Sequence, residues 1–544
     1  MACRSVRLNL RFYAVLVAFC ACALPARARA GGFEFPDNGT ASMSRGGAFA
    51  ATADDGLAVH YNPAGLAFQK GTKLTLGGNL VNENLTFTRK YTDGTSAAPV
   101  SNQSGVFPAP HIFLSHDFGL QDWNFAVGVY GPSAVGKVQF PTNGASRYML
   151  LDEDMLLAFI SFSAAWSPTP ELAVGATFQW MYMPKTHFAM TTGGYFNPND
   201  AGAHCDNPQK TATNPCGYAN NAYDVNTVID ASQTFAPALR LGGMYRPGDH
   251  WSFALAGRVM PIDMEATGKV QIVPSAAMEK LASLSHPKDG VTLSLKMPWT
   301  AVAGVRYAGG KQGVDSWDVE LNVNYEAWKS LDAFRLKFEG PVKMTLQGNT
   351  FDQPLADVSI PKQYQDVWSV RLGGSYPIVR GLSLRAGAYY ESAAVKQDYT
   401  NLDFIGWDRV GLAAGLSWKI TPNYEVAAGF EEILQPSRTV TNSQVREVEA
   451  LSPCQPPYTS ASCKTLGKGA DASPPVVGNG LFESSFQIAS LSLIAHWGGT
   501  KPASQPAALP AQSAPPVLAP PAPAEPAPLA PPAPEAPVPV APGA

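Results

Sequence analysis

Apolar residues alternate with polar or small residues along several long stretches of this chain. The clearest stretches run over 172–182, 317–326 and 409–420. Successive side chains of a β-strand point to opposite sides, so each stretch predicts a strand with one apolar face. In the last stretch that face consists of Val410, Leu412, Ala414, Leu416, Trp418 and Ile420. Strands of soluble sandwiches usually have about five or six residues, and the greater length of these stretches favours strands that cross a membrane.

The same pattern predicts fourteen strands between residues 72 and 497. We place their starts near 72, 107, 122, 153, 170, 233, 249, 290, 315, 364, 380, 406, 422 and 483. An even number of antiparallel strands closes a barrel with both ends on one side. The fold class that we predict is therefore all-β: a 14-stranded antiparallel transmembrane β-barrel whose apolar face meets lipid, while a polar face lines a wet lumen.

The connections between the predicted strands differ in length on the two sides of the barrel. After even-numbered strands the turns are short, as at 168–170 and 421–423, whereas most loops after odd-numbered strands are long, as at 190–232 and 438–482. Outer-membrane barrels have short periplasmic turns and long outer loops. The asymmetry therefore predicts that both ends of the barrel lie in the periplasm.

Composition and the start of the chain agree with export to the outer membrane. Only 15% of residues are charged, well below the ~25% of soluble domains. Residues 1–30 have a basic start, an apolar run over 12–24 and the ending Ala28-Arg29-Ala30, which together predict a secretory signal peptide. A lipoprotein anchor at Cys20 or Cys22 is a weaker alternative, because a bulky phenylalanine precedes Cys20. A net charge of -4 gives no indication of nucleic acid as a partner.

Four cysteines remain after the signal peptide, and they form two close pairs. Cys205 and Cys216 lie in one long loop, and Cys454 and Cys463 lie in another. An even number of cysteines in an exported chain favours disulfides over free thiols, so we predict one local disulfide in each loop. Zinc is not indicated, because only His204 accompanies them, and we expect no metal or other cofactor.

Residues 31–71 precede the first strand and show no strand alternation. With both barrel ends in the periplasm, this segment can fold back into the lumen as a hatch; the alternative is a disordered periplasmic arm. A buried charge is tolerated only when it is paired. We therefore expect charges of the hatch to pair with charges on the polar face of the wall: Arg45, Asp54 and Asp55 with residues such as Glu320, Arg371, Arg385 and Glu391.

Two further segments carry hypotheses. Residues 275–284 place Met278, Leu281 and Leu284 at helical spacing, which predicts a short surface helix that packs on a neighbouring loop or contacts a ligand. Residues 498–544 form a Pro/Ala-rich tail, with 16 prolines after position 500. Such a tail cannot build a core, so we expect it to be disordered in the periplasm. It is either a passive spacer or a contact to the cell wall.

Several motifs follow one another in a characteristic order. Near the start of the predicted mature chain they are Gly31-Gly32-Phe33, Arg45-Gly46-Gly47-Ala48, Ala53-Asp54-Asp55 and Asn62-Pro63-Ala64-Gly65-Leu66, and further on Gly128-Val129-Tyr130-Gly131-Pro132, Arg147-Tyr148, Ile360-Pro361 and Asn479-Gly480-Leu481-Phe482. This order resembles the long-chain fatty acid transporter (FadL) family, which includes aromatic-hydrocarbon uptake proteins. The resemblance covers about residues 31–497.

The resemblance implies a mechanism. Outer loops catch hydrophobic ligands, which pass to an internal pocket and leave sideways through the wall at a kink in the third strand. At the matching place Pro132 cannot donate a ladder hydrogen bond, and Gly131 weakens the strand beside it; the alternative is an ordinary strand end. Asn62, Pro63 and Ala64 would then form a structural hinge of the hatch, because Pro63 fixes φ and Asn62 can bond its own backbone.

The resemblance also suggests candidate ligand contacts: Phe33, Phe35, Arg147, Lys185, His187, Met278, Leu281 and Leu284. The family's best-studied transporter has basic residues after its fifth strand that meet a carboxylate. Only Lys185 and His187 lie nearby in this chain, and neither matches the family position residue by residue. That departure puts a fatty acid in doubt and leaves aromatic hydrocarbons and other apolar ligands open.

The function predicted from the sequence is passive outer-membrane transport of hydrophobic small molecules, by a monomer whose partners are those ligands and the outer-membrane lipid. We find no catalytic motif and no phosphate-binding loop, so we do not expect an enzyme. The main alternative is a structural anchor or adhesin with a sealed barrel and a tail that binds the cell wall. A lipid-modifying barrel enzyme is a third hypothesis, which would need a polar catalytic cluster.

Overall fold

The structure is a computed structural model of the chain. It describes residue 32 and residues 38–91, 94–131, 136–192, 224–276, 278–309, 316–355, 357–448 and 476–498. Several expectations fall outside these residues: the signal peptide, Phe33, Phe35, Pro132, both cysteine pairs and the proline-rich tail.

A hatch precedes the strands and contains three short helices: α2 (Thr40–Met43), α3 (Ala58–Tyr61) and the 3-10 helix η1 (Pro63–Phe68). The wall consists of β1 (Thr72–Arg89), β3 (Phe107–His116), β4 (Trp123–Tyr130), β5 (Lys137–Gln139), β6 (Asp152–Trp166), β7 (Leu172–Thr192), β8 (Val225–Tyr245), β9 (Trp251–Arg258), β10 (Ile262–Pro274), β12 (Gly290–Met297), β13 (Thr300–Ala308), β14 (Asp318–Glu326), β15 (Ala333–Phe338), β18 (Val358–Pro361), β19 (Val367–Val379), β20 (Leu382–Glu391), β21 (Arg409–Thr421), β22 (Tyr424–Val440) and β23 (Gly480–Trp497). A two-residue strand, β2 (Val100–Ser101), pairs with the upper end of β1.

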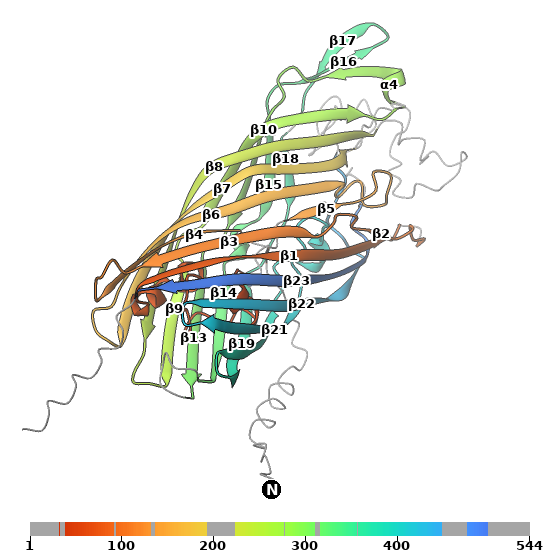
Figure 1. Ribbon diagram of the computed structural model, residues 1–544. Coiled ribbons are helices and arrows are strands. Elements are labelled where there is room, and N and C mark those ends of the chain that lie inside the picture. Colours follow the sequence, from red (N-terminus) through yellow and green to blue (C-terminus); the bar gives the residue numbers. More distant parts are fainter. Residues whose placement is uncertain are drawn as a thin grey trace, which may run out of the picture. The chain divides into compact units, whose positions relative to one another are not determined.

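The sheet closes on itself, because β1 pairs with β3 on one side and with β23 along its whole length on the other. Figure 1 shows β1 and β23 running side by side. Five of the barrel strands are divided into two pieces each, namely β4/β5, β9/β10, β12/β13, β14/β15 and β18/β19. With these pieces joined, the wall has fourteen antiparallel strands, which confirms the predicted fold class.

Proline accompanies several of the divisions between strand pieces. Pro261 separates β9 from β10, Pro298 separates β12 from β13, and Pro361 ends β18. A proline has no backbone N–H and therefore interrupts a hydrogen-bonded ladder. The lower pieces β9, β13, β14 and β19 pair with one another, and so do the upper pieces β10, β12, β15 and β18.

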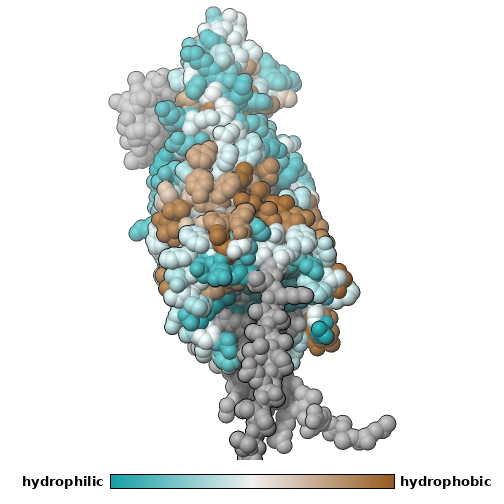
Figure 2. Space-filling view, turned by 60° about the vertical axis from the view of Figure 1, so that its left-hand side comes forward, coloured by the Kyte–Doolittle hydropathy of each residue, from teal (hydrophilic) through white to brown (hydrophobic). Residues whose placement is uncertain are grey.

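The outer face of the lower barrel is a hydrophobic belt, which Figure 2 shows below a more hydrophilic upper surface. The predicted apolar faces lie there: Leu412, Leu416 and Ile420 of β21 and Val319, Leu321 and Val323 of β14 are exposed. Aromatic side chains gather at its two edges. The lower edge includes Trp123, Trp166, Trp251, Trp317, Trp418 and Trp497, and the upper edge includes Trp180, Phe235, Trp299 and Trp368. Such girdles mark the two interfaces of a membrane.

Strand β6 reverses its polarity along its length. Toward the end of the strand at Trp166, apolar side chains such as Phe162 face outward, while Ser161 and Ser163 face inward. Toward its start, Asp152 and Asp154 face outward, and the inward positions carry Glu153 followed by the apolar residues Met155, Leu157 and Phe159. The expected polar lumen is therefore wrong for the upper barrel. Above the lipid the outer face meets water, so the interior follows the apolar pattern of a soluble protein.

A second sheet lies at the upper end of the barrel, where Figure 1 shows β16 and β17. It consists of β11 (Ala282–Ser285), β16 (Val342–Leu346) and β17 (Asn349–Gln353), and α4 (Met278–Leu281) leads into it. The helix predicted over 275–284 is thus only one turn long, and Leu284 lies in a strand instead. Residues 282–285 form a strand because they pair with residues 343–346 of β16, which are distant in sequence.

Within the described ranges, no helix has the length and apolar character needed to cross a membrane. In the same part of the chain, no group of three His, Cys, Asp or Glu side chains is placed to hold a metal ion.

We predict that an arginine in the belt destabilises the barrel far more than one on the upper outer face. Leu416→Arg would place a charge in lipid and should cost about 2–4 kcal/mol. Glu265→Arg on the outward, exposed face of β10 should change stability little. Urea titrations of both variants folded into lipid vesicles measure the difference. Equal losses would mean that the upper outer face also lies in lipid.

Candidate functional site

Arg45 anchors the hatch to the lower wall. Its side chain is buried and lies 2.7 Å from Asp318 and 3.5 Å from Glu320, both on β14. The guanidinium also donates to the Ser375 hydroxyl at 2.7 Å and to the Thr52 hydroxyl at 3.0 Å. These contacts satisfy a charge that would otherwise be costly to bury.

The expected pairing of hatch and wall charges is confirmed for Arg45 with Glu320. The other wall charges pair among themselves instead: Arg371 lies 3.4 Å from Glu391, which also binds Arg409, and Arg385 lies 3.3 Å from Glu425. Asp54 and Asp55 form no ion pair with any described residue. The carboxylate of Asp55 accepts the backbone N–H of Leu57 at 2.8 Å.

Asn62 joins the hatch to itself and to the wall. Its side-chain oxygen accepts the N–H of Ala64 at 3.1 Å and so caps η1, in which Pro63 takes the first position. Its amide donates to the carbonyl of Ala50 at 3.0 Å and to the carbonyl of Gly243 in β8 at 3.2 Å. Asparagine suits this position because one side chain supplies both an acceptor and a donor.

Glycines of the wall face the hatch wherever its backbone comes close. A Cβ added to Gly242 would overlap the side chain of Asn62, and one added to Gly175 would lie 2.5 Å from the carbonyl carbon of Pro63. A Cβ added to Gly373 of β19 or to Gly387 of β20 would likewise overlap the backbone of Arg45. The hatch therefore fits against the wall without room for an additional methyl group at these points.

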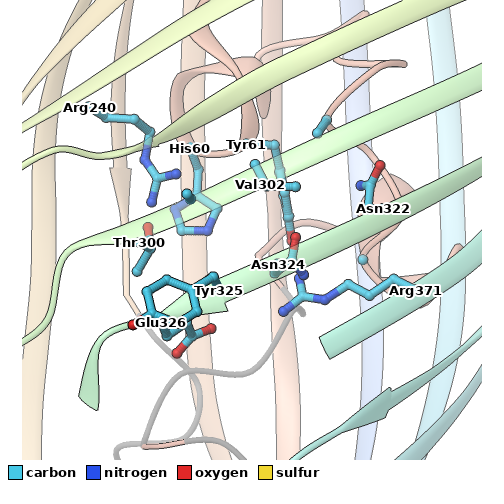
Figure 3. A pocket seen from close by; sticks show the side chains of 13 residues that line it. His60, Tyr61, Arg240, Thr300, Val302, Asn322, Asn324, Tyr325, Glu326 and Arg371 are labelled. Atoms are coloured by element: carbon cyan, nitrogen blue, oxygen red, sulfur yellow. The ribbon is translucent and has the colours of Figure 1, made fainter. Parts of the chain in front are cut away.

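A polar cavity lies between the hatch and the wall (Figure 3). It is just below the two points at which β13 is divided from β12 and β14 from β15. His60 reaches it from the hatch, Arg240 and Arg371 from β8 and β19, and Asn322 and Glu326 from β14. Arg258, which stands opposite Arg240 on the neighbouring strand β9, adds a further buried guanidinium. The cavity is therefore rich in hydrogen-bond donors and in charged groups, with Glu326 as the acidic side chain among them.

His60 is the hatch residue most affected by this charge. Burial, followed by the charges of Arg240, Arg258 and Arg371, lowers its pKa well below the usual value of 6.5. Its ring lies edge-on to Tyr61 and Tyr130, and its Nδ1 atom has no hydrogen-bond partner within the described part of the chain. The imidazole is therefore neutral at physiological pH.

The interior above this cavity is apolar. We call this region the upper lining; it comprises Met155, Leu157, Phe159, Met181, Met183, Ile262, Met264, Leu293, Leu295, Met297, Phe334 and Leu336. A second apolar cluster continues it toward β1, β5 and β23, with Val81, Leu85, Val138, Leu150, Phe482 and Phe486. Methionines are well represented, and their flexible side chains adapt to ligands of different shape.

Within the described residues, the ladder of hydrogen-bonded pairs has a gap between β3 and β4, beside the upper lining. Pairing of β3 with β4 extends from Ile112 to His116, and residues 107–111 of β3 have no partner on that side among the described residues. Pairing resumes above the gap, where the N–H of Gln103 donates to the carbonyl of Gln139 at 2.7 Å. The ring of Phe107 packs against Gly136 across the gap, because a Cβ on Gly136 would overlap that ring.

Gly131, the predicted kink, directly follows the last residue of β4 and so borders this gap. A Cβ added to it would lie 2.5 Å from the carbonyl oxygen of Leu157. Pro108 and Pro110 of β3 lie within the unpaired stretch and carry no N–H. At these two positions β3 has no N–H group to donate to a neighbouring strand.

The candidate ligand contacts that the structure describes lie apart from one another. Arg147 lies 3.5 Å from Asp224 and stacks on Tyr148. Lys185 and His187 pair with Asp154 at 2.6 Å and Asp230 at 2.7 Å, at the partly exposed upper part of β7. Met278 packs with Ala282 and Met344 of the small upper sheet, and Leu284 packs against the same cluster. Leu281 is the last residue of α4. Their roles as ligand contacts stay predictions.

Sequence reasoning missed the upper lining and Phe107. Met155, Leu157 and Phe159 alternate with Leu156, Ala158 and Ile160, so both faces of this stretch are apolar. The signal that could have identified the inward face is Asp152 and Asp154, which share a face and point to water at the upper end of the strand.

A closed barrel with a lipid-facing belt, aromatic girdles and an internal hatch defines an outer-membrane β-barrel protein. The chain belongs to the family described as "Outer membrane protein transport protein (OMPP1/FadL/TodX)", whose sequence profile matches residues 21–465. The protein is accordingly located in the outer membrane, and its family is one of transport proteins.

Curated relatives and solved structures agree with this assignment. Outer membrane protein P1 of Haemophilus influenzae (strain Rd) is 23% identical over 427 residues, which cover 74% of this chain and 86% of that protein. Matches to Outer membrane protein P1 from another Haemophilus influenzae sequence (30% identity) and to the 47 kDa outer membrane protein of Pasteurella multocida (27%) span only 24% and 29% of those proteins.

Among solved structures, a Pseudomonas aeruginosa FadL homologue aligns with a TM-score of 0.63 at 16% identity, covering 86% of this chain and 100% of that one. The Pseudomonas putida toluene transporter TodX aligns with a TM-score of 0.54 at 15% identity, covering 85% and 99%. At these identities the likeness shows the fold.

We predict that Gly242→Ala loosens the hatch, because the added methyl group overlaps Asn62. Overpacking of this kind should cost about 1–3 kcal/mol. The matched control is Gly243→Ala, whose added Cβ would have Leu255 oxygen as its nearest neighbour, at 4.0 Å. Hydrogen exchange of residues 38–71 should accelerate in the first variant only. Unchanged exchange in Gly242→Ala would contradict the tight fit.

Docking of the hatch should depend on pH through Asp55. Burial, followed by the neighbouring Asp54, raises its pKa from 3.8 to about 7. The docked hatch therefore keeps a proton that a released hatch loses, so docking is strongest below about pH 4 and weakens as the pH rises to about 7. Asp55→Asn should remove this dependence, which hatch exchange rates at pH 5 and pH 8 measure. If the exchange rates of Asp55→Asn changed between pH 5 and pH 8 as much as those of the unmodified protein, another group would be responsible for the pH dependence.

Proposed function

We propose that this protein carries hydrophobic small molecules passively across the outer membrane and releases them sideways through its wall. The single observation that carries this proposal is the polarity reversal inside the barrel. An apolar upper lining lies above a charged lower lumen, so an apolar molecule that enters from outside is stabilised only in the upper half.

The hatch supports lateral rather than axial release. Directly below the upper lining lie the guanidinium-rich cavity and the ion pairs of Arg45, which an apolar molecule would have to cross without compensation. We place the lateral route instead at the gap beside residues 107–111 of β3, which lies next to the upper lining and is bordered by Phe107 and Gly131. Movement of the Phe107 ring is the smallest change that would widen it.

Membership of the family supports this function, and its relatives suggest the substrate classes. The solved relatives include proteins named as a FadL homologue and as a toluene transporter. Long-chain fatty acids and aromatic hydrocarbons are therefore the first ligands to test. The competing function is a structural anchor or adhesin. It would require a sealed wall, and it would not account for the apolar interior.

Uptake measurements test the route. In cells or proteoliposomes that contain the full chain, Phe107→Ala should increase uptake of labelled toluene and oleate several-fold, because it removes the ring that fills the gap. Replacement of Gly131-Pro132 by two strand-forming residues should reduce uptake about tenfold or more. Leu120→Ala, in the exposed turn between β3 and β4, serves as the control and should behave as the unmodified protein.

Three results would contradict the proposal. Uptake that is unaffected by straightening Gly131-Pro132 would exclude lateral release at this gap. Uptake that is unaffected by deletion of residues 31–66 would show that the hatch does not direct the ligand. Absence of uptake for every apolar probe would favour the structural anchor.

A further inference from the structure

Two carboxyl groups face the inside of the upper barrel without a partner. Glu153 of β6 is 6% exposed and points inward between Met155 and Val138, and neither it nor Glu83 of β1 forms a hydrogen bond or ion pair through its carboxylate with any described residue. Asp152 and Asp154 on the same strand point outward and are bonded to Gln139 and Lys185. Of these three acidic residues of β6, Glu153 is therefore the one whose carboxyl group has no partner among the described residues.

An unpaired carboxylate among apolar side chains is unfavourable, because burial removes its hydration. Glu153 interacts electrostatically with Glu83, Asp403 and Lys362. Lys362 is already bound to both oxygens of Asp403. Three carboxyl groups thus share one ammonium group, and Glu153 and Glu83 are the two that have no cation bound to them among the described residues.

Lys362 shows which group satisfies a carboxylate in this setting. Its side chain is buried at 1% exposure, its ammonium group binds Asp403, and the same ammonium lies 4.5 Å from the centre of the Phe334 ring. An alkyl chain that ends in an ammonium group is therefore held here by one carboxylate and one aromatic face. A ligand with the same chemistry fits the unpartnered carboxylates beside it.

Glu83 and Glu153 also lie on the two sides of the wall gap. Glu83 is two residues beyond Val81, the partner of Phe107 at the end of the β1–β3 ladder. Glu153 pairs with Val138 of β5, which follows Gly136 on the other side of the gap. A ligand held between the two carboxylates is therefore next to the place of proposed release.

We propose that Glu153, assisted by Glu83, binds the ammonium group of a hydrophobic amine inside the barrel and that the upper lining binds its apolar part. This inference rests on the proposed transport function and narrows its substrate class. Protonated alkyl or aryl-alkyl amines are preferred, neutral hydrocarbons of the same size bind more weakly, and carboxylates are repelled.

Binding of three octyl probes to the purified full chain in a maltoside detergent tests this at neutral pH. Octylammonium should bind at least about tenfold more tightly than octanol or octanoate, as a charged hydrogen bond implies. Glu153→Gln should lower the octylammonium affinity about tenfold and leave the octanol affinity unchanged. Glu83→Gln should act in the same direction with a smaller loss.

The matched control is Asp154→Asn, the next residue on β6, whose side chain faces outward and binds Lys185 at 2.6 Å. It should leave all three affinities unchanged. Retention of the octylammonium affinity in both Glu153→Gln and Glu83→Gln would overturn the inference, and so would octanoate binding as tight as that of octylammonium. If Glu153→Gln fails to fold, Glu83→Gln and the order of the three probes decide.

The same titrations separate this inference from the proposed function. Equal binding of octanol and octylammonium would overturn the amine preference and leave hydrophobic transport intact. Absence of binding for all three probes would contradict both.

Discussion

The buried guanidinium of Arg45, held by Asp318 and Glu320, is the contact on which the rest of the molecule depends. A charge at this depth requires charges on the wall, so the inward face of β14 must be acidic at this level. Side-chain alternation then leaves Val319, Leu321 and Val323 on the outer face, where they meet lipid. Hatch, polar lower lumen and hydrophobic belt are thus consequences of one constraint. The glycines Gly373 and Gly387 let the backbone of Arg45 approach the wall closely enough to satisfy it.

The same strands meet two different solvents, and this explains the interior. Within lipid the outer face must be apolar, and the inside is free to be polar. Above lipid the outer face meets water, and the inside becomes apolar, as β6 shows between Asp152 and Phe162. The reversal gives the barrel an apolar upper interior without any change of fold. It also explains the divisions at Pro261 and Pro298, which lie where the strands pass from one environment to the other.

Much of the fold could be predicted from the sequence, because the lipid-facing strands alternate clearly. The fourteen strands and the Arg45–Glu320 pair followed from local pattern and from the need to pair buried charge. The upper lining did not follow, because Met155 and Leu157 alternate with residues that are also apolar. The helix over 275–284 was overestimated because pairing of Ala282–Ser285 with β16 is a tertiary effect. The gap that the described residues show at 107–111 was indicated in the sequence only by Gly131-Pro132, since pairing between strands depends on tertiary structure.

The upper and lower parts of the interior also differ in their charged groups. For the amine ligands proposed here, this difference favours the upper part of the barrel over the lower cavity. The upper interior holds the unpartnered carboxyl groups of Glu83 and Glu153, whereas the cavity below is lined by Arg240, Arg371 and Glu326 near a neutral His60. A hydrophobic ammonium ion is attracted to the first level, whereas charged side chains line the second and give its apolar part no favourable contact. Glu83 and Glu153 therefore hold such an ion beside the gap at Phe107. The charge of the cavity thus supports the hatch in closing the axial route, even if the hatch itself is transiently displaced.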